Sequence, residues 1–151
     1  MTTIAVSKTQ IAADRQATHN AGMKFKLKTK LYSFDNLVFY GTPFHIGLAG
    51  NMDTFADVID YFTDPTAHKK APRLNGGEAV ILTQDGKIWT FSKADIWIGV
   101  DQPFYAIGSG MLFAMGAMEQ GATPVEAVKA AIKHDPSSGY GVTKIDLGKS
   151  L

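Results

Sequence analysis

The sequence predicts an α+β fold in which helices cover the outer faces of packed antiparallel sheets. Two observations predict it. Strand-like segments follow one another through short polar turns, as antiparallel strands do. The elements come in the order strands, helix, strands, two helices, strand, which lacks the regular strand and helix alternation of a doubly wound parallel sheet. At 151 residues the chain fits one domain, residues 1–151, without a linker or an internal repeat.

The first elements are expected to be strands joined by tight turns. The pattern TIAVS, KT, QIAAD predicts two strands between Thr3 and Asp14, and the second strand returns the chain to its own start. Another strand is expected at Lys30–Phe34, followed by a turn at Asp35-Asn36. The segments NLVFY and HIGLAG, on either side of a GTP turn, are expected to be strands as well.

Three segments have the pattern of helices. Asp53–Phe62 has apolar residues at positions 55, 58, 59 and 62, which lie on one face of a helix. Gly110–Gln120 is expected to form an apolar helix. Thr123-Pro124-Val125-Glu126 is a capping box with proline at the first helical position, and its helix should reach about His134.

The remaining segments are expected to be a loop and strands. The stretch TAHKKAPRLNGG, which follows the Asp64-Pro65 stop of the first helix, has the composition of a loop. EAVILT and IWTF form a predicted hairpin around Asp85-Gly86. IWIGV, FYAIG and GVTKIDL are expected to be further strands.

The composition excludes several functions. A net charge of +1 gives no field for binding nucleic acid, and the absence of cysteine excludes disulfides and thiolate chemistry. The longest apolar run, Met111–Met118, is too short to span a membrane, and no leader pattern is present, so a cytoplasmic protein is expected. The histidines at positions 19, 45, 68 and 134 lack the spacing of a metal site, so neither a metal nor a cofactor is expected.

Several local features could carry chemistry. A methionine that precedes a small residue is normally removed, which would leave Thr2 with both a hydroxyl and a free amine, a candidate nucleophile and base. Lys30 opens the segment KLYSFD, and two turns of small residues occur at IGSG and DPSSGYG. Each feature alone is also explained by an ordinary structural role, namely a lysine on an edge strand, a glycine turn or the end of a helix.

Taken together and in this order, these features resemble the proteasome β-subunit and HslV family of N-terminal nucleophile hydrolases. The resemblance spans nearly the whole chain, through TTIAV, AADRQAT, KLYSFD, GLAGNMDTF, FYAIGSGMLFAMGAME and HDPSSGYG. It implies a four-layer αββα sandwich of two antiparallel sheets. The segment after Asp53–Phe62 is too short for the family's usual second helix, so one outer helix is expected to be reduced or missing.

The resemblance also implies the catalytic groups. Thr2 would be the nucleophile, and its α-amine, which titrates near pH 8, would accept the proton. Lys30 would be the cation that lowers the pKa of this amine, and Asp14 would pair with Lys30 and orient it. Gly50 would offer its backbone N–H to the oxyanion.

Two further groups of residues follow from the resemblance. A hydrogen-bonded ring around the α-amine would be formed by Ser109, Asp135 and Ser138, whose two hydroxyls can donate and accept while the carboxylate accepts. The primary specificity pocket would be lined by Ala17, Lys28 and Leu48. Leu48 favours a substrate with an apolar residue before the cleaved bond, whereas Lys28 favours one with an acidic residue there. The sequence does not decide between these two preferences.

The chain departs from the family pattern in ways that favour a shortened, HslV-like member of bacterial or phage type. It carries NLVFYGTPF between KLYSFD and HIGLAG, ends soon after GVTKIDL, and has Met1 directly before Thr2. The expected function is a threonine-type peptidase that cleaves polypeptides in a homo-oligomeric ring, with an ATPase unfoldase or cap as a possible partner. The alternatives are a catalytically silent assembly module and an amidase for small substrates.

Overall fold

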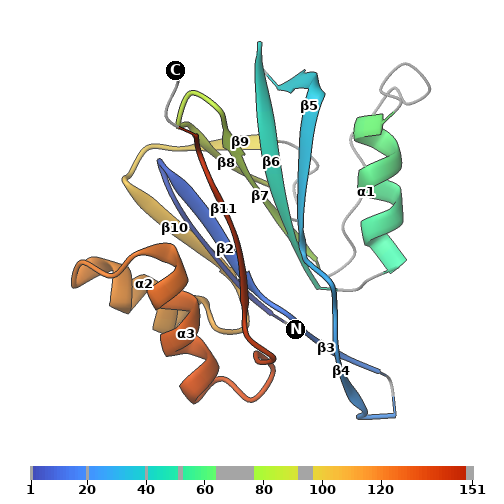
Figure 1. The fold of residues 1–151 in the computed structure, drawn as a ribbon, viewed down its shortest axis with the longest axis vertical. Coiled ribbons are helices and arrows are strands. Elements are labelled where there is room, and N and C mark those ends of the chain that lie inside the picture. Colours follow the sequence, from blue (N-terminus) through green and yellow to red (C-terminus); the bar gives the residue numbers. More distant parts are fainter. Residues whose placement is uncertain are drawn as a thin grey trace.

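The protein consists of four layers. The computed structural model describes residues 2–19, 21–39, 41–50, 53–63, 77–91 and 97–148. Helix α1 (Asp53–Thr63) covers one side of the molecule, helices α2 (Met111–Glu119) and α3 (Pro124–His134) cover the other, and two antiparallel sheets lie between them (Figure 1). This is the αββα arrangement that the resemblance implied. In the described part of the chain, α1 is the sole helix on its side, and the segment 64–76, where a second helix was expected to be reduced or missing, lies outside that part.

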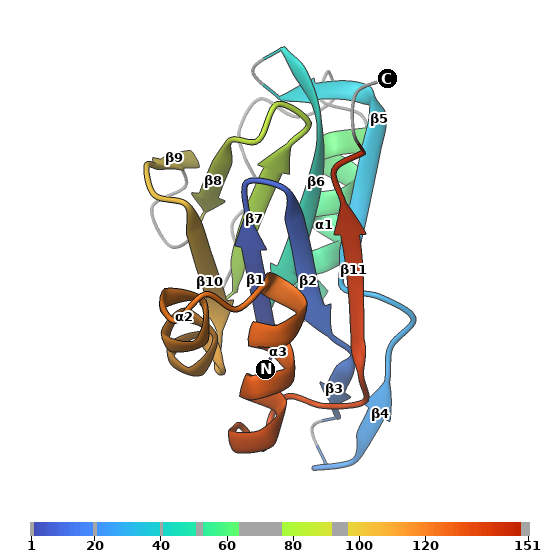
Figure 2. The same ribbon diagram turned by 60° about the vertical axis from the view of Figure 1, so that its left-hand side comes forward.

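The first sheet has four strands in the order β10-β1-β2-β11. Their bounds are β1 (Thr3–Ser7), β2 (Gln10–Asp14), β10 (Phe104–Gly108) and β11 (Val142–Asp146). All three pairings are antiparallel. Figure 2 shows α2 and α3 in front of this sheet.

Residue size on the two faces of the first sheet explains its packing. Ala5, Ala12 and Ala106 belong to the cluster that packs with α2 and α3, so small side chains allow the helices to approach the sheet closely. The opposite face presents larger residues such as Ile4 and Ile11 to the second sheet. Strict alternation along each strand therefore builds two different interfaces from one sheet.

The second sheet has five strands in the order β5-β6-β7-β8-β9. Their bounds are β5 (Leu31–Phe39), β6 (Thr42–Ala49), β7 (Glu78–Thr83), β8 (Ile88–Phe91) and β9 (Trp97–Val100). The predicted turn at Asp35-Asn36 is wrong, because β5 continues through these positions. The register with β6 shifts between Phe34 and Phe39, and this irregularity accommodates the extra residues of the hairpin.

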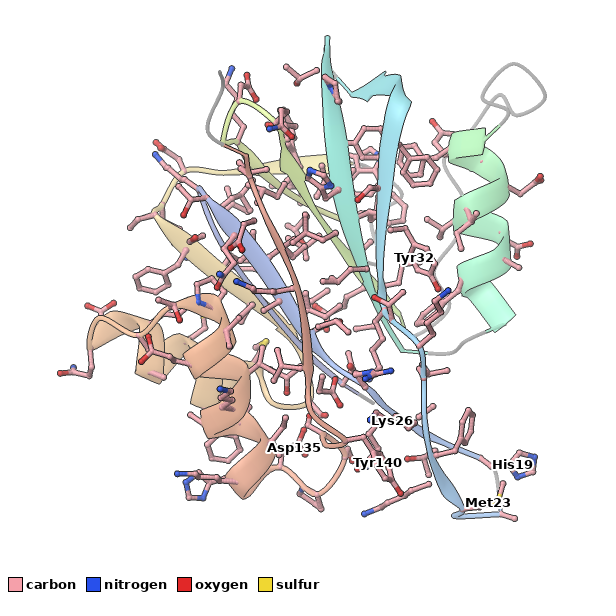
Figure 3. The ribbon with its side chains drawn as sticks, viewed as in Figure 1. His19, Met23, Lys26, Tyr32, Asp135 and Tyr140 are labelled. Carbon is pink, nitrogen blue, oxygen red and sulfur yellow. The ribbon has the colours of Figure 1, made fainter. Side chains whose placement is uncertain are left out.

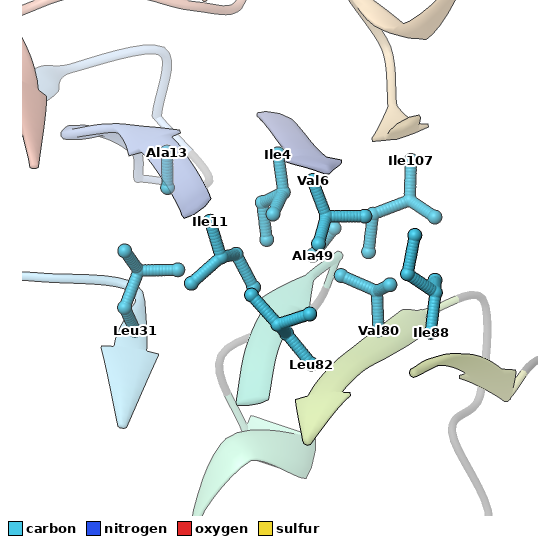
Figure 4. Packing of buried hydrophobic residues seen from close by; sticks show 10 residues of the cluster. All are labelled: Ile4, Val6, Ile11, Ala13, Leu31, Ala49, Val80, Leu82, Ile88 and Ile107. Carbon is cyan, nitrogen blue, oxygen red and sulfur yellow. The ribbon is translucent and has the colours of Figure 1, made fainter. Parts of the chain in front are cut away.

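The core between the sheets is aliphatic. Figure 4 shows ten side chains of this cluster, contributed by both sheets. Ile4, Val6 and Ile107 from the first sheet meet Val80 and Leu82 from the second, and all five are fully buried. Burial of each such side chain contributes about 1.5–3 kcal/mol, so this layer holds the two sheets together.

An aromatic cluster fixes α1 on the outer face of the second sheet. Phe55, Val58 and Phe62 of the helix pack against Phe44 and Leu48 of β6. The predicted face of this helix is therefore the face that is buried. The two other predicted helices also form, and α3 has the expected capping box, in which the Thr123 hydroxyl accepts from the Glu126 backbone N–H.

A short antiparallel ribbon projects from one end of the molecule (Figure 1). It consists of β3 (Gln16–Thr18) and β4 (Lys24–Lys26), with Ala17 opposite Phe25. We call residues 15–30, which contain these two strands, the β3–β4 ribbon. It connects the end of β2 to the beginning of β5.

Three predictions fall on residues outside the described part. These are the state of Met1, the helix stop at Asp64-Pro65 and most of the loop predicted at TAHKKAPRLNGG, which contains His68. In the described ranges, no helix combines the length and the apolar character that a membrane span requires.

Candidate active site

The predicted catalytic residues come together where strands of the first sheet begin and end. Thr2 precedes β1, and the register pairs Thr3 with Gly108, the last residue of β10. Asp14, the last residue of β2, pairs with Val142, the first residue of β11. Because these strands are antiparallel, four chain segments that are distant in sequence meet at one end of the sheet.

Thr2, Asp14 and Lys30 form one hydrogen-bonded cluster. The Thr2 hydroxyl donates to Asp14 Oδ1, and the Lys30 ammonium donates to Thr2 Oγ1. Lys30 Nζ also lies 2.9 Å from Asp14 Oδ1 and forms an ion pair with it. The exposed fractions are 2% for Thr2, 0% for Asp14 and 3% for Lys30, so the three groups interact with little screening by water.

Backbone donors hold the Asp14 carboxylate in place. Oδ1 accepts from the Thr3 N–H at 3.1 Å, and Oδ2 accepts from the N–H groups of Gln16 at 3.2 Å and Gly139 at 3.0 Å. A buried carboxylate needs such partners because its desolvation is costly. Asp14 is therefore fixed in orientation by the start of β1, by the β3–β4 ribbon and by the segment before β11.

Two opposing effects act on Lys30. Desolvation by burial is the larger one and lowers the pKa of its ammonium below the usual 10.5. The charge and the hydrogen bond of Asp14 and, more weakly, the charge of Asp135 oppose this effect and raise the pKa. Burial thus disfavours the charged form of Lys30, and the interaction with the Asp14 carboxylate offsets part of this cost.

A second polar cluster lies beside the first. Asp135 Oδ2 accepts from the hydroxyls of Ser109 at 2.6 Å and Ser138 at 2.7 Å. The Ser109 hydroxyl also lies 3.2 Å from the Thr2 carbonyl oxygen, and Ser138 Oγ lies 2.7 Å from Thr3 Oγ1. The three residues predicted as a ring near the amine of Thr2 are therefore connected to each other and to the beginning of β1.

The pKa of Asp135 reflects these contacts. Burial acts to raise the pKa, but the hydrogen bonds from the Ser109 and Ser138 hydroxyls and from the Ser137 backbone N–H outweigh it, and the pKa is lowered. The cluster therefore favours the ionised form of Asp135. In this form the carboxylate accepts hydrogen bonds from its neighbours and donates none.

The glycines around Ser109 are required by close packing. Gly108 has φ +95°, and a Cβ at this position would lie 2.7 Å from the Thr2 carbonyl carbon. A Cβ at Gly110 would collide with Thr3 Oγ1 and lie 3.0 Å from Ala131 Cβ. The residues before and after Ser109 must therefore be glycines, because a larger side chain at either position would collide with Thr2 or Thr3.

Four predicted residues are not members of these two polar clusters. Gly50 follows β6 directly, with φ +110°. Ala17 is 6% exposed in β3, Lys28 is exposed, and Leu48 is fully buried in the cluster under α1. Their roles as an oxyanion donor and as pocket residues stay predictions.

Three residues that contribute contacts to the site, Thr3, Gln16 and Gly139, were not predicted from the sequence. Thr3 contributes its N–H to Asp14 and its hydroxyl to Ser138, and Gln16 contributes an N–H to Asp14. Tyr140 has φ +61°, which is uncommon outside glycine, and it follows Gly139, whose N–H binds Asp14. The doubled threonine at the start of the chain is the one sequence signal that could have identified Thr3.

Among the described residues, no group of three histidine, aspartate or glutamate side chains has the arrangement of a metal site. The acidic side chains of the two clusters are instead satisfied by Lys30 and by hydroxyl and backbone donors. The arrangement is that of a buried hydroxyl with a cation and a carboxylate beside it.

No protein-family model and no curated protein matches the chain. Solved structures do match. An Anbu (Gly-1) mutant from Hyphomicrobium sp. strain MC1 superimposes with a TM-score of 0.74 at 11% identity, covering 97% of this chain and 81% of Anbu. BPH from Thiobacillus denitrificans in complex with epoxomicin matches with a TM-score of 0.68 at 17% identity, covering 98% and 99%. HslV from Trypanosoma brucei matches with a TM-score of 0.68 at 15% identity, covering 95% and 97%. At these identities the likeness concerns the fold.

Proposed function

We propose that this chain, which has the fold of proteasome-type and HslV-like subunits, is a threonine-type peptidase with Thr2 as its nucleophile. The proposal rests on one observation: the Thr2 hydroxyl contacts both Lys30 and Asp14 in a buried cluster at the beginning of β1. A hydroxyl with a cation and an oriented carboxylate beside it has the surroundings of an activated nucleophile. Removal of Met1 supplies the remaining group, a free α-amine on the same residue.

The reaction proceeds in two steps. The α-amine of Thr2 takes the proton of the hydroxyl while Oγ1 attacks the carbonyl carbon of a peptide bond. The C–N bond then breaks, the leaving amine receives the proton, and the acyl group stays on Thr2 as an ester. Water, activated by the same amine, attacks the ester, releases the carboxylic acid and restores the Thr2 hydroxyl.

Lys30 and Asp14 support this chemistry electrostatically. A cation next to Thr2 favours the neutral form of the α-amine, which titrates near pH 8 in its unperturbed state, and so increases the fraction that can act as a base. Ser109, Asp135 and Ser138 orient the amine. Gly50 donates its N–H to the oxyanion, where loss of one donor typically costs about 100- to 1000-fold in rate.

The proposed peptidase works as a homo-oligomer. Helix α2 carries no charged residue from Met111 to Met118, yet Leu112 is 75% and Phe113 44% exposed. A helix that is apolar all round is normally buried. Contact with a second subunit would cover these side chains, and Leu112→Lys is expected to lower the oligomer mass measured by light scattering.

The substrate, location and assembly partners belong to the same proposal. Polypeptides are the expected substrates, with Ala17, Lys28 and Leu48 around the residue before the cleaved bond. The protein acts in the cytoplasm, where methionine aminopeptidase removes Met1 ahead of a small residue. A ring with an ATPase unfoldase or a cap is the expected form of the assembly.

The test is the intact mass of the protein before and after epoxomicin, together with hydrolysis of a fluorogenic peptide. The trimmed wild type should gain one inhibitor per chain and cleave the peptide. Thr2→Ala should still lose Met1 but take up no inhibitor and cleave no peptide, whereas Thr2→Ser keeps a hydroxyl and should retain measurable activity. A trimmed wild-type chain without adduct or hydrolysis contradicts the proposal and favours a silent assembly module.

A further inference from the structure

The charge of the chain is distributed unevenly. Residues 15–30, the β3–β4 ribbon, contain five of the fifteen lysines and arginines and none of the fourteen aspartates and glutamates. The rest of the chain therefore has ten basic and fourteen acidic residues. The overall net charge of +1 is therefore the sum of +5 for the ribbon and −4 for the rest of the chain, which we call the body, with histidine neutral.

This ribbon is the segment that connects two residues of the candidate active site. Asp14 immediately precedes it, and Lys30 is its last residue. Figure 3 shows Lys26 at the same end of the molecule as Asp135 and Tyr140, with His19 and Met23 farther out. The positive charge is therefore located at the end of the sheet where Thr2 lies.

Hydrogen bonds hold the ribbon against the loop that follows α3. Gln16 Nε2 and Lys24 Nζ both donate to the Pro136 carbonyl oxygen at 3.0 Å. The Arg15 backbone N–H donates to the Gly139 carbonyl at 3.0 Å. Because this loop also carries Asp135, the charges of the ribbon have a defined position relative to the site.

The exposed lysines of the ribbon are not neutralised within the described part of the chain. Lys24 binds a neutral carbonyl, and Lys26 and Lys28 are exposed and make no ion pair with a described residue. The nearby carboxylates, Asp14 and Asp135, are buried and occupied by Lys30 and by serine hydroxyls. These ammonium groups are therefore available to an anionic ligand.

We propose that the β3–β4 ribbon recruits acidic segments of the polypeptide substrate to Thr2. This inference rests on the proposed peptidase function. A cluster of one charge sign beside a reactive site raises the local concentration of ligands of the opposite charge and speeds their association. The acidic body of a second subunit is another conceivable occupant, but the position of the ribbon between Asp14 and Lys30 favours the substrate.

The first experiment uses wild-type protein and two fluorogenic peptides with the same residues around the cleaved bond. One peptide continues in a run of glutamates and the other in a run of glutamines. The ratio of their kcat/KM values should favour the acidic peptide at about 0.01 M salt and approach one at about 1 M, as the Debye length falls from about 30 Å to about 3 Å. The effect should be on KM, with kcat alike for the two peptides.

The second experiment compares two double variants with the same loss of charge. Lys24→Gln with Lys26→Gln should lower the low-salt ratio by about 2- to 30-fold, the loss expected for two exposed ion pairs. Glutamine at position 24 keeps an N–H donor for Pro136. Lys8→Gln with Lys87→Gln removes two exposed lysines away from the ribbon and should keep the wild-type ratio. If the first double variant folds poorly, Lys26→Gln alone gives the same comparison.

Binding of labelled, uncleaved glutamate and glutamine peptides, followed by fluorescence anisotropy, separates this inference from the peptidase proposal. Hydrolysis without any preference for the acidic peptide overturns the inference and leaves the peptidase intact. Preferential binding without hydrolysis refutes the peptidase and retains acidic recognition by the ribbon. An altered oligomer mass in the ribbon variant with an unchanged ratio overturns the inference, because it assigns the ribbon to a contact between copies.

Discussion

Replacing Lys30 with methionine tests whether the buried cluster depends on its ion pair. Methionine has nearly the length of lysine but no charge, so the substitution leaves the Asp14 carboxylate, which is 0% exposed, without its cation. Removal of one partner of a buried pair costs about 3–5 kcal/mol. Because Asp14 keeps three backbone N–H donors, we expect the free energy of unfolding to fall by the lower end of this range, about 3 kcal/mol.

A double-mutant cycle isolates the interaction between the two residues. Asp14→Asn should cost a similar amount, because it leaves the ammonium of Lys30 buried without its carboxylate. In the double variant no unpaired charge remains, so its loss should be smaller than the sum of the single losses by about 2–3 kcal/mol. Urea unfolding at one fixed protomer concentration measures all four proteins. Single losses that add within about 0.5 kcal/mol would refute the coupling.

The pH dependence of the same variants gives a second check. Burial lowers the pKa of Lys30 below 10.5, so between the two values the unfolded chain binds a proton that the native chain has released. The stability of the wild type relative to Lys30→Met should therefore rise with pH through this interval and become constant above it. A difference that does not change with pH up to 10.5 would mean that burial does not disfavour the Lys30 cation.

Three further substitutions test the surroundings of the site and its scaffold. Gly108→Ala adds a Cβ against the Thr2 carbonyl and strains a positive φ, so unfolding midpoints should show a loss of about 2–5 kcal/mol. Its control is Gly116→Ala in α2, where nothing lies within 4 Å of the new Cβ and a gain of about 0.5–1 kcal/mol is expected; equal effects of the two would contradict the steric argument. Thr123→Ala removes the capping box with Glu126 and should cost about 1 kcal/mol, which an unchanged thermal midpoint would disprove.

Local sequence signals predicted most of the elements because their causes are local. The Thr123 and Glu126 side chains determine the start of α3 through contacts three residues apart, and the observed box agrees. Asp35-Asn36 illustrates the opposite case. These residues favour turns in isolation, but here they lie inside β5, between Phe34 and Phe39, which both pair with β6.

The centre of the site could be anticipated only in part. The sequence predicted Thr2, Asp14 and Lys30 through a family resemblance, since no spacing rule brings residues 12 and 28 positions apart into one hydrogen-bonded cluster. The contact of Thr3 with Ser138 spans 135 positions and depends on where β11 and α3 lie. Such contacts follow from the arrangement of the strands and cannot be read from local patterns.

The uneven charge of the molecule also has a consequence for an assembly, because the β3–β4 ribbon contains five basic residues and no acidic one. A rotation axis that relates identical subunits places equivalent parts of each subunit at the same height along the axis. In a closed ring, the ribbons would therefore be repeated at one height along the axis and form a single positive band. The field of this band would increase with the number of subunits, so a polyanionic chain would be attracted by the whole assembly before it reaches any one Thr2.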